Sequence, residues 1–380
     1  MLLIKNIEIY APKFLGKKDV LIGGRKILLV EDKLHLDHKK VQVIDGKGKK
    51  MVPGFIDQHV HITGGGGEGS FKTRVPEITL SKLTKAGITT VVGLLGTDST
   101  TRSVENVLAK AKALKEEGIS AYIHTGSYEY PTKTLTDSIK KDIVFIDEII
   151  GAKIALSDHR SSNINEDELA RLASDVRVAG MMSGKAGILV VHMGNGDKGL
   201  KPIMNVVENT EVPIKIIRPT HVNRRENLLI ESFDFAKKGG IIDLTCGIYD
   251  KLAPGKVILR AKEKNVPIEN ITMSSDGYGS WSNYDDYGNL IEIGASQVDS
   301  LFYEFKKMVD TLDYNIEEAL MYLTSNVAKA LNLYPKKGCI QERSDADLLI
   351  LDKNLDIDTV IANGRIMIQK KEIFVKGTYE

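Results

Sequence analysis

The sequence predicts an α/β protein: a (β/α)8 TIM-like barrel with a small β-sandwich domain formed by both chain termini. Three observations predict this fold. Short apolar strand patterns alternate with helical patterns through the middle of the 380 residues, as expected for parallel strands joined by helical crossovers. Both ends carry strand patterns without helices. Polar residues suited to metal binding follow several of the middle strands, where barrels carry their chemistry.

Residues 1–52 and 344–380 are expected to form the small β domain together. The first segment holds aliphatic runs such as 26–30 and 41–44, and pairs such as Asp45-Gly46 supply the turns between runs. The tail has the same character, with the turn signal Asn363-Gly364 between two apolar runs. Neither segment is long enough to bury a core by itself, so one domain built from both is the simplest solution.

Residues 53–343 are expected to form the barrel. Eight strands are predicted, at 55–61, 88–95, 119–125, 152–156, 188–192, 214–220, 241–244 and 271–274. Helical patterns lie between them, such as 226–238, which ends at Gly239-Gly240. The glycine run at 64–67 lacks the G-x-G-x-x-G spacing before a helix, so it does not predict a dinucleotide site.

Composition narrows the possible partners and the compartment. The chain has 52 basic and 51 acidic residues, which offers no basic field for nucleic acid or an anionic membrane. Two cysteines, Cys246 and Cys339, are too few for a disulfide framework and fit a reducing compartment. The first residues lack the layout of a signal peptide, and no apolar run has membrane-spanning length. We therefore expect a cytoplasmic protein without nucleic-acid or membrane partners.

Two histidines, His59 and His61, stand in the first predicted barrel strand, directly before the glycine run. Strand alternation places both imidazoles on one face, where they can reach a single ion. The pattern is also that of a half-buried strand that happens to carry two histidines. His192, His221 and Asp276 come at or just after later strands.

Each of these five residues has an ordinary alternative, since a strand-end histidine is commonly a surface group and an Asp before Gly commonly forms a turn. Their shared position at one rim favours a metal site. They exceed the three protein ligands of one catalytic zinc, which favours two metal ions. Among the remaining histidines, His35 and His38 are interpreted as solvated loop residues. His159 does not lie at a predicted strand end, and His124 stays undecided.

Lys153 lies within the apolar fourth strand of the predicted barrel. A buried ammonium is costly unless it is paired. From composition alone, an ion pair with an acidic side chain is the preferred interpretation.

The run from Pro53 to His61 resembles the opening signature of the amidohydrolase superfamily. Within it, the chain resembles the bacterial isoaspartyl (β-aspartyl) dipeptidases over essentially its whole length. The matching segments are Gly64–Glu68, Leu94–Asp98, Ser157–Arg160, His192–Gly194, Pro219–Arg224, Ser274–Gly277 and Val375–Thr378.

The resemblance implies a metal-dependent barrel with two divalent ions, zinc being the expected metal. His59, His61 and Asp276 would hold one ion, and His192 and His221 would hold the other. Lys153 would be carboxylated, and its carbamate would bridge both ions, which would account for a buried lysine. A homo-oligomer is also implied, with an octamer as the expected state.

The same resemblance implies a metallo-dipeptidase that hydrolyses isoaspartyl dipeptides. A metal-bridging hydroxide would attack the side-chain amide, Asp276 would move the proton, and Tyr128 would polarise the scissile carbonyl. Glu68 would receive the substrate α-amino group, although its place in a glycine-rich loop alone favours a solvated side chain. The remaining substrate contacts would be Thr97, Arg160, Arg224 and Ser280. The stretch 281–284 matches no family pattern. It could alter the preference for the leaving amino acid, but an unrelated surface loop is the expected interpretation.

Two other functions stay open. A hydantoinase or dihydroorotase would use the same metals on a cyclic amide, but such substrates have no ammonium for Glu68. A metal-free binding protein on the same fold is a different class, and it would be expected to have lost ligands that this sequence retains.

Overall fold

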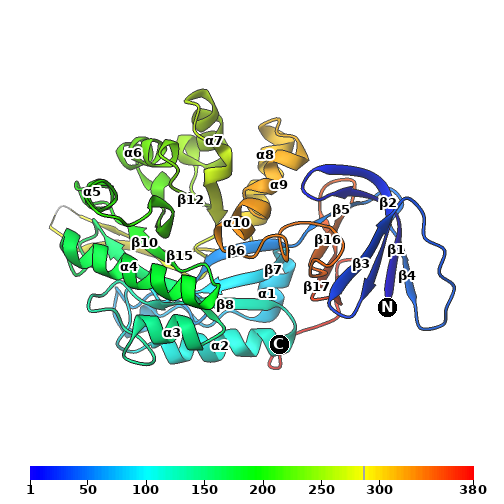
Figure 1. Cartoon of the computed structure of the whole chain (residues 1–380), viewed down its shortest axis with the longest axis horizontal. Helices are drawn as coiled ribbons and strands as arrows, with labels where there is room; N and C mark the ends of the chain where they lie inside the picture. Colours follow the sequence, from blue (N-terminus) through cyan, green and yellow to red (C-terminus); the bar gives the residue numbers. More distant parts are fainter. Residues whose placement is uncertain (286) are drawn as a thin grey trace.

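The computed structural model describes residues 1–285 and 287–380. Two units lie side by side along the long axis of the molecule (Figure 1). One is a barrel of strands with helices around it, and the other is a β-sheet that contains both ends of the chain.

The barrel consists of eight strands that follow one another in sequence order around the sheet. They are β6 (Phe55–Val60), β7 (Ile88–Gly93), β8 (Ser120–Gly126), β9 (Ile149–Leu156), β10 (Ile188–Met193), β11 (Ile217–Thr220), β12 (Ile242–Thr245) and β13 (Ile271–Ser274). Every neighbouring pair is parallel. A parallel bridge between Val60 and Gly277 joins the first strand to the segment after the last. The predicted parallel barrel is confirmed.

The start of the sixth barrel strand differs from the prediction. Residues 214–216, expected to begin the sixth strand, form a short 3-10 helix, η2 (Ile214–Ile216). The N–H of Ile216 bonds back to the carbonyl of Pro213 at 2.9 Å, so this turn satisfies the backbone locally. Pairing with β10 begins only at Ile217, opposite Leu189.

Helices cover the outside of the barrel (Figure 1). They are α1 (Leu80–Lys85), α2 (Val104–Glu117), α3 (Ile139–Phe145), α4 (Glu166–Ser183), α5 (Lys201–Asn209), α6 (Glu226–Lys237), α7 (Pro254–Glu263), α8 (Ser300–Thr311), α9 (Ile316–Met321) and α10 (Ser325–Ala330). Helix α4 begins with a capping box between Asn165 and Glu168. No helix in the described part of the chain is both long and apolar enough to cross a membrane.

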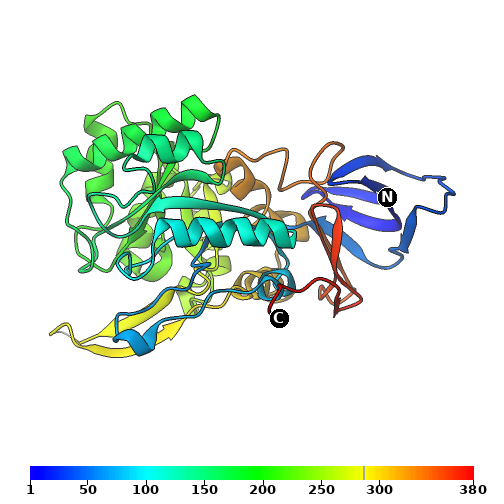
Figure 2. The same cartoon turned by 90° about the horizontal axis from the view of Figure 1, so that it is seen from below.

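The terminal unit is one nine-stranded sheet to which both chain ends contribute (Figure 2). Its strands are β1 (Leu2–Tyr10), β2 (Phe14–Gly23), β3 (Lys26–Glu31), β4 (Gln42–Asp45), β5 (Lys50–Pro53), β16 (Leu348–Leu351), β17 (Ile357–Ala362), β18 (Arg365–Gln369) and β19 (Glu372–Ile373). Antiparallel pairing of β5 with β16, including Met51 opposite Ile350, joins the two ends. These strands form one hydrogen-bonded sheet, and their buried apolar side chains form a cluster separate from that of the barrel. We propose that residues 1–52 and 344–380 form one domain and that residues 53–343 form the other.

The stretch 281–284 is not a loop. It belongs to β14 (Ser280–Tyr284), which pairs with β15 (Leu290–Ala295) in a hairpin. This hairpin extends from the barrel beside the segment that holds η1 (Phe71–Thr73) (Figure 2). Alternation of half-buried and exposed side chains along β14 is the pattern of an edge hairpin rather than of a solvated loop.

Lys337 forms the polar core of the junction between the two units, and only 2% of it is exposed. Its ammonium contacts the carboxylates of Asp345, at 3.0 Å, and Asp347. The Asp347 carboxylate also accepts the N–H of Asn363 at 2.6 Å, while its carbonyl accepts the N–H of Gly54 at 2.8 Å. Burial lowers the pKa of Lys337, but the two carboxylates outweigh burial and raise it. Lys337 is therefore a buried cation shared by two carboxylates, and Lys26 Nζ contacts one of them, Asp345, at 2.7 Å.

We expect Lys337→Met to lower the stability of the folded chain strongly. The substitution leaves the buried Asp347 carboxylate without its cation, whereas Asp345 keeps Lys26 Nζ at 2.7 Å. Breaking a buried ion pair costs about 3–5 kcal/mol. Thermal unfolding of the variant at neutral pH measures the effect. Lys336→Met, at the exposed neighbouring position, is the control, and equal melting temperatures of the two variants would contradict the prediction.

Candidate functional site

Five barrel strands deliver the predicted metal-binding residues to one rim. His59 and His192 lie within β6 and β10, Lys153 lies in β9, and His61 directly follows β6. His221 directly follows β11. The carboxyl ends of parallel strands share one edge of a barrel, which is why residues distant in sequence meet there.

Two of the candidates stand where the backbone leaves a strand in a left-handed conformation. His221 has a φ of 61° and Asp276 a φ of 51°, values that non-glycine residues adopt only when the surroundings hold them. Asn223 supplies such support after His221, because its side chain bonds both the N–H (2.8 Å) and the carbonyl (3.0 Å) of Thr245. The His221 Nδ1 contacts the Thr245 hydroxyl at 2.7 Å, which directs the other ring nitrogen elsewhere.

The side chains meet closely. Lys153 Nζ lies 3.0 Å from His59 Nε2. Asp276 Oδ1 lies 3.2 Å from His61 Nε2 and 3.5 Å from His59 Nε2, and its Oδ2 lies 4.0 Å from His221 Nδ1. The rings of His192 and His221 pack edge to face with centroids 4.7 Å apart.

Burial sets the protonation of this cluster. It lowers the pKa of His59, His192 and His221 well below the usual imidazole range. Burial also lowers the pKa of Lys153 to about 7. It raises the pKa of Asp276, but the imidazoles of His221 and His61 outweigh burial and lower it to about 2. Neutral imidazoles beside an ionised carboxylate are the forms in which these groups bind metals.

The donor set fits divalent metal ions. Ligand atoms of His59, His221 and Asp276 all lie within 4.8 Å of one another. His221 Nε2 and Asp276 Oδ1 are buried and form no hydrogen bond with the residues that the structure describes. Buried lone pairs without donors are costly, and a cation would satisfy them. This group differs from the predicted ligand sets of the two ions. Asp276 lies near His59, which was assigned to the same ion, and also near His221, which was assigned to the other.

No carboxylate of residues 1–285 and 287–380 lies within 4.0 Å of Lys153 Nζ. The ion pair preferred from composition is therefore wrong, and the amine contacts an imidazole instead. His124, undecided from the sequence, is buried in β8, and burial lowers its pKa to about 3. His35 and His38 are exposed, as expected, and His159 is exposed as well.

A second cluster surrounds Glu68. Its Oε1 accepts hydrogen bonds from Ser280 Oγ at 2.8 Å, Thr97 Oγ1 at 3.3 Å and Arg160 Nη1 at 3.3 Å. The Glu68 side chain is only 6% exposed, so the solvated position that a glycine-rich loop favours is wrong. Glu68 Oε2 is buried and forms no hydrogen bond within the described ranges, which leaves it available to a donor from outside the chain.

Asp158 and Tyr128 connect the two clusters. Asp158 accepts bonds from Arg160 Nε (2.9 Å) and Nη2 (2.8 Å), and its Oδ2 lies 3.1 Å from His192 Nε2. Tyr128 Oη lies 2.7 Å from His192 Nδ1, and its ring faces the Arg160 guanidinium at 5.4 Å. Arg224 Nη1 lies 3.4 Å from His192 Nε2 and donates to the Met193 carbonyl at 2.8 Å. All predicted site residues thus meet in one region.

Asp158 received no assignment from the sequence, although it lies in the matching segment 157–160. The signal was its spacing, because an acid two residues before an arginine can bond that side chain across a turn. Burial raises the pKa of Asp158, but the bonds from Arg160 and His192 outweigh burial and lower it far below its usual range. It is the counter-ion of Arg160.

Two further buried acids brace the strands below the site. Asp243 on β12 accepts bonds from Gln58 (2.6 Å), Thr220 (2.9 Å) and other neighbours. Asp57 accepts the N–H of Ser275 at 3.2 Å. Burial raises the pKa of Asp57 to about 7. The two carboxylates tie β6, β11, β12 and the segment after β13 together beneath the candidate ligands.

Comparison with known proteins places this arrangement in a family. A family model, the amidohydrolase family, matches residues 51–367. The solved β-aspartyl dipeptidase of Fervidobacterium islandicum AW-1, in complex with β-Asp-Leu dipeptide, is 40% identical, with a TM-score of 0.94, over 98% of this chain and 97% of that chain. The dihydroorotase of Staphylococcus epidermidis is 32% identical over 116 residues, a match that spans 30% of this chain and only 27% of that protein.

A solved dihydropyrimidinase from Brevibacillus agri NCHU1002 is 17% identical with a TM-score of 0.64, over 99% of this chain and 96% of that chain. That similarity concerns the fold alone. The family model covers most of the chain, and the Fervidobacterium enzyme matches it nearly end to end. The chain therefore belongs to the amidohydrolase family and is a hydrolase.

Proposed function

We propose that this chain is a β-aspartyl dipeptidase that hydrolyses the side-chain amide of isoaspartyl dipeptides. The observation that carries the proposal is the buried Glu68 carboxylate, held by Arg160, Ser280 and Thr97 beside the histidine cluster. The similarity to a dipeptidase solved with β-Asp-Leu supports the same substrate class.

The charges of the site match those of the substrate. An isoaspartyl dipeptide carries one ammonium, one carboxylate on the isoaspartyl residue and one at its C-terminus. Glu68 supplies an anion for the ammonium, and Arg160 and Arg224 supply two cations for the carboxylates, which guanidinium groups bind well. Arg160 is partly engaged by Asp158, so its Nη1, which now contacts Glu68, is the donor available to a substrate.

We assign the metal-binding role to His59, His61, Lys153, His192, His221 and Asp276. Two divalent ions held there would lower the pKa of a bound water to about 7 and polarise the scissile carbonyl. Imidazole and carboxylate suit several divalent metals, and availability decides among them, so zinc is our assignment by resemblance. Lys153 is buried and has no carboxylate within 4.0 Å among the residues that the structure describes, and it is the residue that we propose to be carboxylated.

We assign roles at the reacting atoms to two side chains, Tyr128 and Asp276. Burial raises the pKa of Tyr128, so its hydroxyl stays protonated and can donate a hydrogen bond to the oxygen on which negative charge develops. Asp276 is ionised at neutral pH and can accept a proton at Oδ1. It can then deliver that proton to the departing amine, an acid–base contribution of about 10²–10⁴-fold.

Hydrolysis of a cyclic amide is the second candidate, because the dihydroorotase of Staphylococcus epidermidis matches part of the chain. Such substrates carry no ammonium. They would leave the buried Glu68 Oε2, which has no donor among the described residues, without a hydrogen bond, and this costs binding free energy.

A comparison of three substrates tests the proposal. We expect the metal-loaded protein to hydrolyse β-Asp-Leu, with little activity on α-Asp-Leu and none on hydantoin, because only the first places its ammonium at Glu68 and its amide at the cluster. Release of leucine and opening of the hydantoin ring are the measurements. Faster turnover of hydantoin than of β-Asp-Leu would exclude the dipeptidase assignment.

We expect Glu68→Gln to lose the preference for a free amine. A charge-assisted hydrogen bond is worth about 1.5–3 kcal/mol, so kcat/KM on β-Asp-Leu should fall about tenfold to a hundredfold. The value on N-acetyl-β-Asp-Leu should change much less. Glu105→Gln, at an exposed position on α2, is the control. If wild type treats both substrates alike, Glu68 does not bind the ammonium.

We expect two metal ions per chain in protein purified without chelators, and fewer in Lys153→Ala, because the variant lacks the proposed bridging ligand. Elemental analysis measures the content, and the exposed Lys82→Ala is the control. Small carboxylic acids should restore metal content to Lys153→Ala if the native ligand is a carbamate. Equal metal content in wild type and Lys153→Ala would refute the bridge.

The homo-oligomer stays a prediction, which the mass of the protein in solution would test.

A further inference from the structure

The segment that carries Glu68 is a closed loop between β6 and α1. Its outgoing part, from Thr63, and its returning part, through Val75, lie backbone to backbone. The N–H of Val75 bonds the carbonyl of Gly65 at 2.9 Å, and the N–H of Gly67 bonds the carbonyl of Thr73 at 3.3 Å. Glu68 follows the outgoing part, so its position depends on how these two parts are held.

Glycine is required where the two parts touch. A Cβ at Gly64 would lie 2.0 Å from the Val75 carbonyl oxygen, and one at Gly66 would lie 2.2 Å from the Thr73 carbonyl oxygen. Both residues also have positive φ, at 78° and 85°. The absence of side chains lets the two backbones pair, but these glycines provide no side-chain contact that would hold the paired loop to the barrel.

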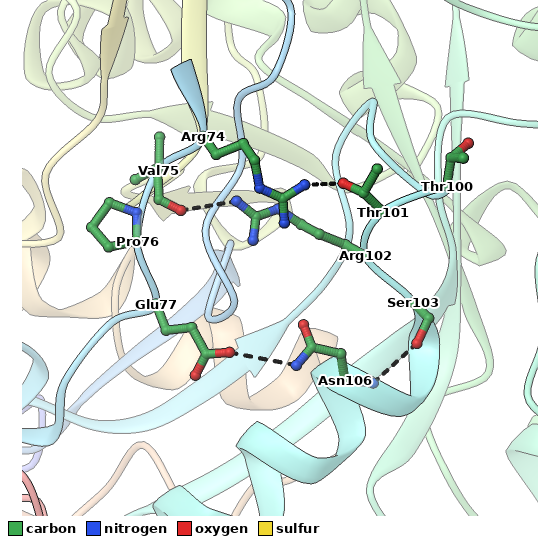
Figure 3. Close-up of a pocket in the computed structure, with 9 residues that line it drawn as sticks. All are labelled: Arg74, Val75, Pro76, Glu77, Thr100, Thr101, Arg102, Ser103 and Asn106. Carbon is green, nitrogen blue, oxygen red and sulfur yellow. Dashed lines mark hydrogen bonds between the residues drawn. The ribbon is translucent and has the colours of Figure 1, made fainter. Parts of the chain in front are cut away.

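Arg102 provides that contact. It lies between β7 and α2 and is only 8% exposed. Its guanidinium donates to three backbone carbonyls, those of Thr63, of Gly65 at 3.1 Å and of Val75 at 2.9 Å. Figure 3 shows Arg102 reaching across the pocket to Val75, next to the guanidinium of Arg74. One rigid planar group thus joins both parts of the loop to the barrel.

The same network reaches the other side of Glu68. Asp98 follows Thr97, which bonds Glu68 directly. Asp98 Oδ2 lies 3.1 Å from Arg74 Nη1, on the returning part of the loop, and 3.9 Å from Arg102 Nε. These contacts keep the Thr97 segment and the Glu68 loop in one arrangement.

We propose that Arg102 is a positioning residue that fixes the Glu68 loop and so sets the preference of the enzyme for substrates with a free amine. Its hydrogen bonds and its ion pair go to Thr63, Gly65, Val75 and Asp98, and among the described residues none of them joins it to Glu68 or to a proposed metal ligand. Its effect on specificity rests on the proposed function of Glu68, whereas its effect on the loop does not. An arginine is required because three carbonyls in different directions need several donors from one planar group.

The test compares wild type, Glu68→Gln, Arg102→Ala and Arg102→Lys on β-Asp-Leu and N-acetyl-β-Asp-Leu. In Arg102→Ala, we expect the ratio of kcat/KM values for the two substrates to fall about tenfold or more, the size of one charge-assisted hydrogen bond. Metal content should equal that of wild type. The kcat/KM ratio of Arg102→Lys should lie between those of wild type and Arg102→Ala, because an ammonium can make only some of the hydrogen bonds of the guanidinium group.

Chemical rescue separates positioning from a general loss of folding. Arg102 lines a pocket of about 560 Å³ together with Arg74, Glu77 and Asn106, so a small guanidinium can enter from solvent. Ethylguanidine should restore part of the amine preference to Arg102→Ala and should leave Arg171→Ala, at an exposed position on α4, unaffected. Wild-type preference in Arg102→Ala without ethylguanidine would overturn the proposal.

Deuterium uptake of residues 62–78 gives a readout that needs no substrate. We expect faster exchange in Arg102→Ala than in wild type or Glu68→Gln, and slower exchange again with ethylguanidine. If wild type shows no amine preference, the proposed function of Glu68 fails, and uptake alone decides whether Arg102 holds the loop. Unchanged uptake in Arg102→Ala overturns the inference in either case.

Discussion

The contact between Lys153 Nζ and His59 Nε2, 3.0 Å apart inside the barrel, is the constraint on which the site depends. Burial disfavours the charged ammonium there and lowers the pKa of Lys153 to about 7. The surrounding imidazoles are also held neutral by burial. A buried cluster of neutral nitrogen donors around the ionised Asp276 has lone pairs that lack protons, and divalent cations are the partners that satisfy such a cluster.

The metal cluster and the Glu68 cluster do not act as separate sites, because His192 and Arg160 share the carboxylate of Asp158. A carboxylate behind a histidine fixes the ring orientation and the tautomer. The same carboxylate holds the Arg160 guanidinium in a bidentate pair. One buried anion therefore sets the direction of a candidate metal ligand and of a candidate substrate-binding cation. Tyr128 adds a second connection, through its hydroxyl to His192 and its ring to Arg160.

The barrel and its loops contribute in different ways. Strand residues such as His59 and Lys153 are held by the parallel ladder and by buried acids such as Asp243, whose bonds cross several strands. Glu68 and Ser280 lie instead on segments that leave the rim, where specificity is usually determined. These segments lie outside the parallel ladder of the barrel, and side chains that bond backbone groups help to set their geometry. Arg102 and Asn223 both hold a turn in this way.

The sequence by itself determined the eight-strand alternation, the composite terminal domain and the candidate ligands at strand ends. These properties are local, since apolar periodicity and the position of a polar residue after a strand can be read along the chain. The segment 214–216 was predicted wrongly, because one backbone bond to Pro213 outweighs apolar content. The stretch 281–284 was also misassigned, because its strand conformation comes from pairing with Leu290–Ala295, which the stretch by itself does not indicate.

Only the tertiary structure decided the environment of each ionisable group. Lys153 has an imidazole rather than an acid as its neighbour, Glu68 is buried rather than solvated, and Asp158 joins two clusters. Burial and neighbouring charge depend on residues far apart in the sequence, and they set both pKa and hydrogen bonding. Arg102 is the clearest case, because nothing near it in the sequence indicates that its guanidinium meets three carbonyls of a loop 27 to 39 residues earlier.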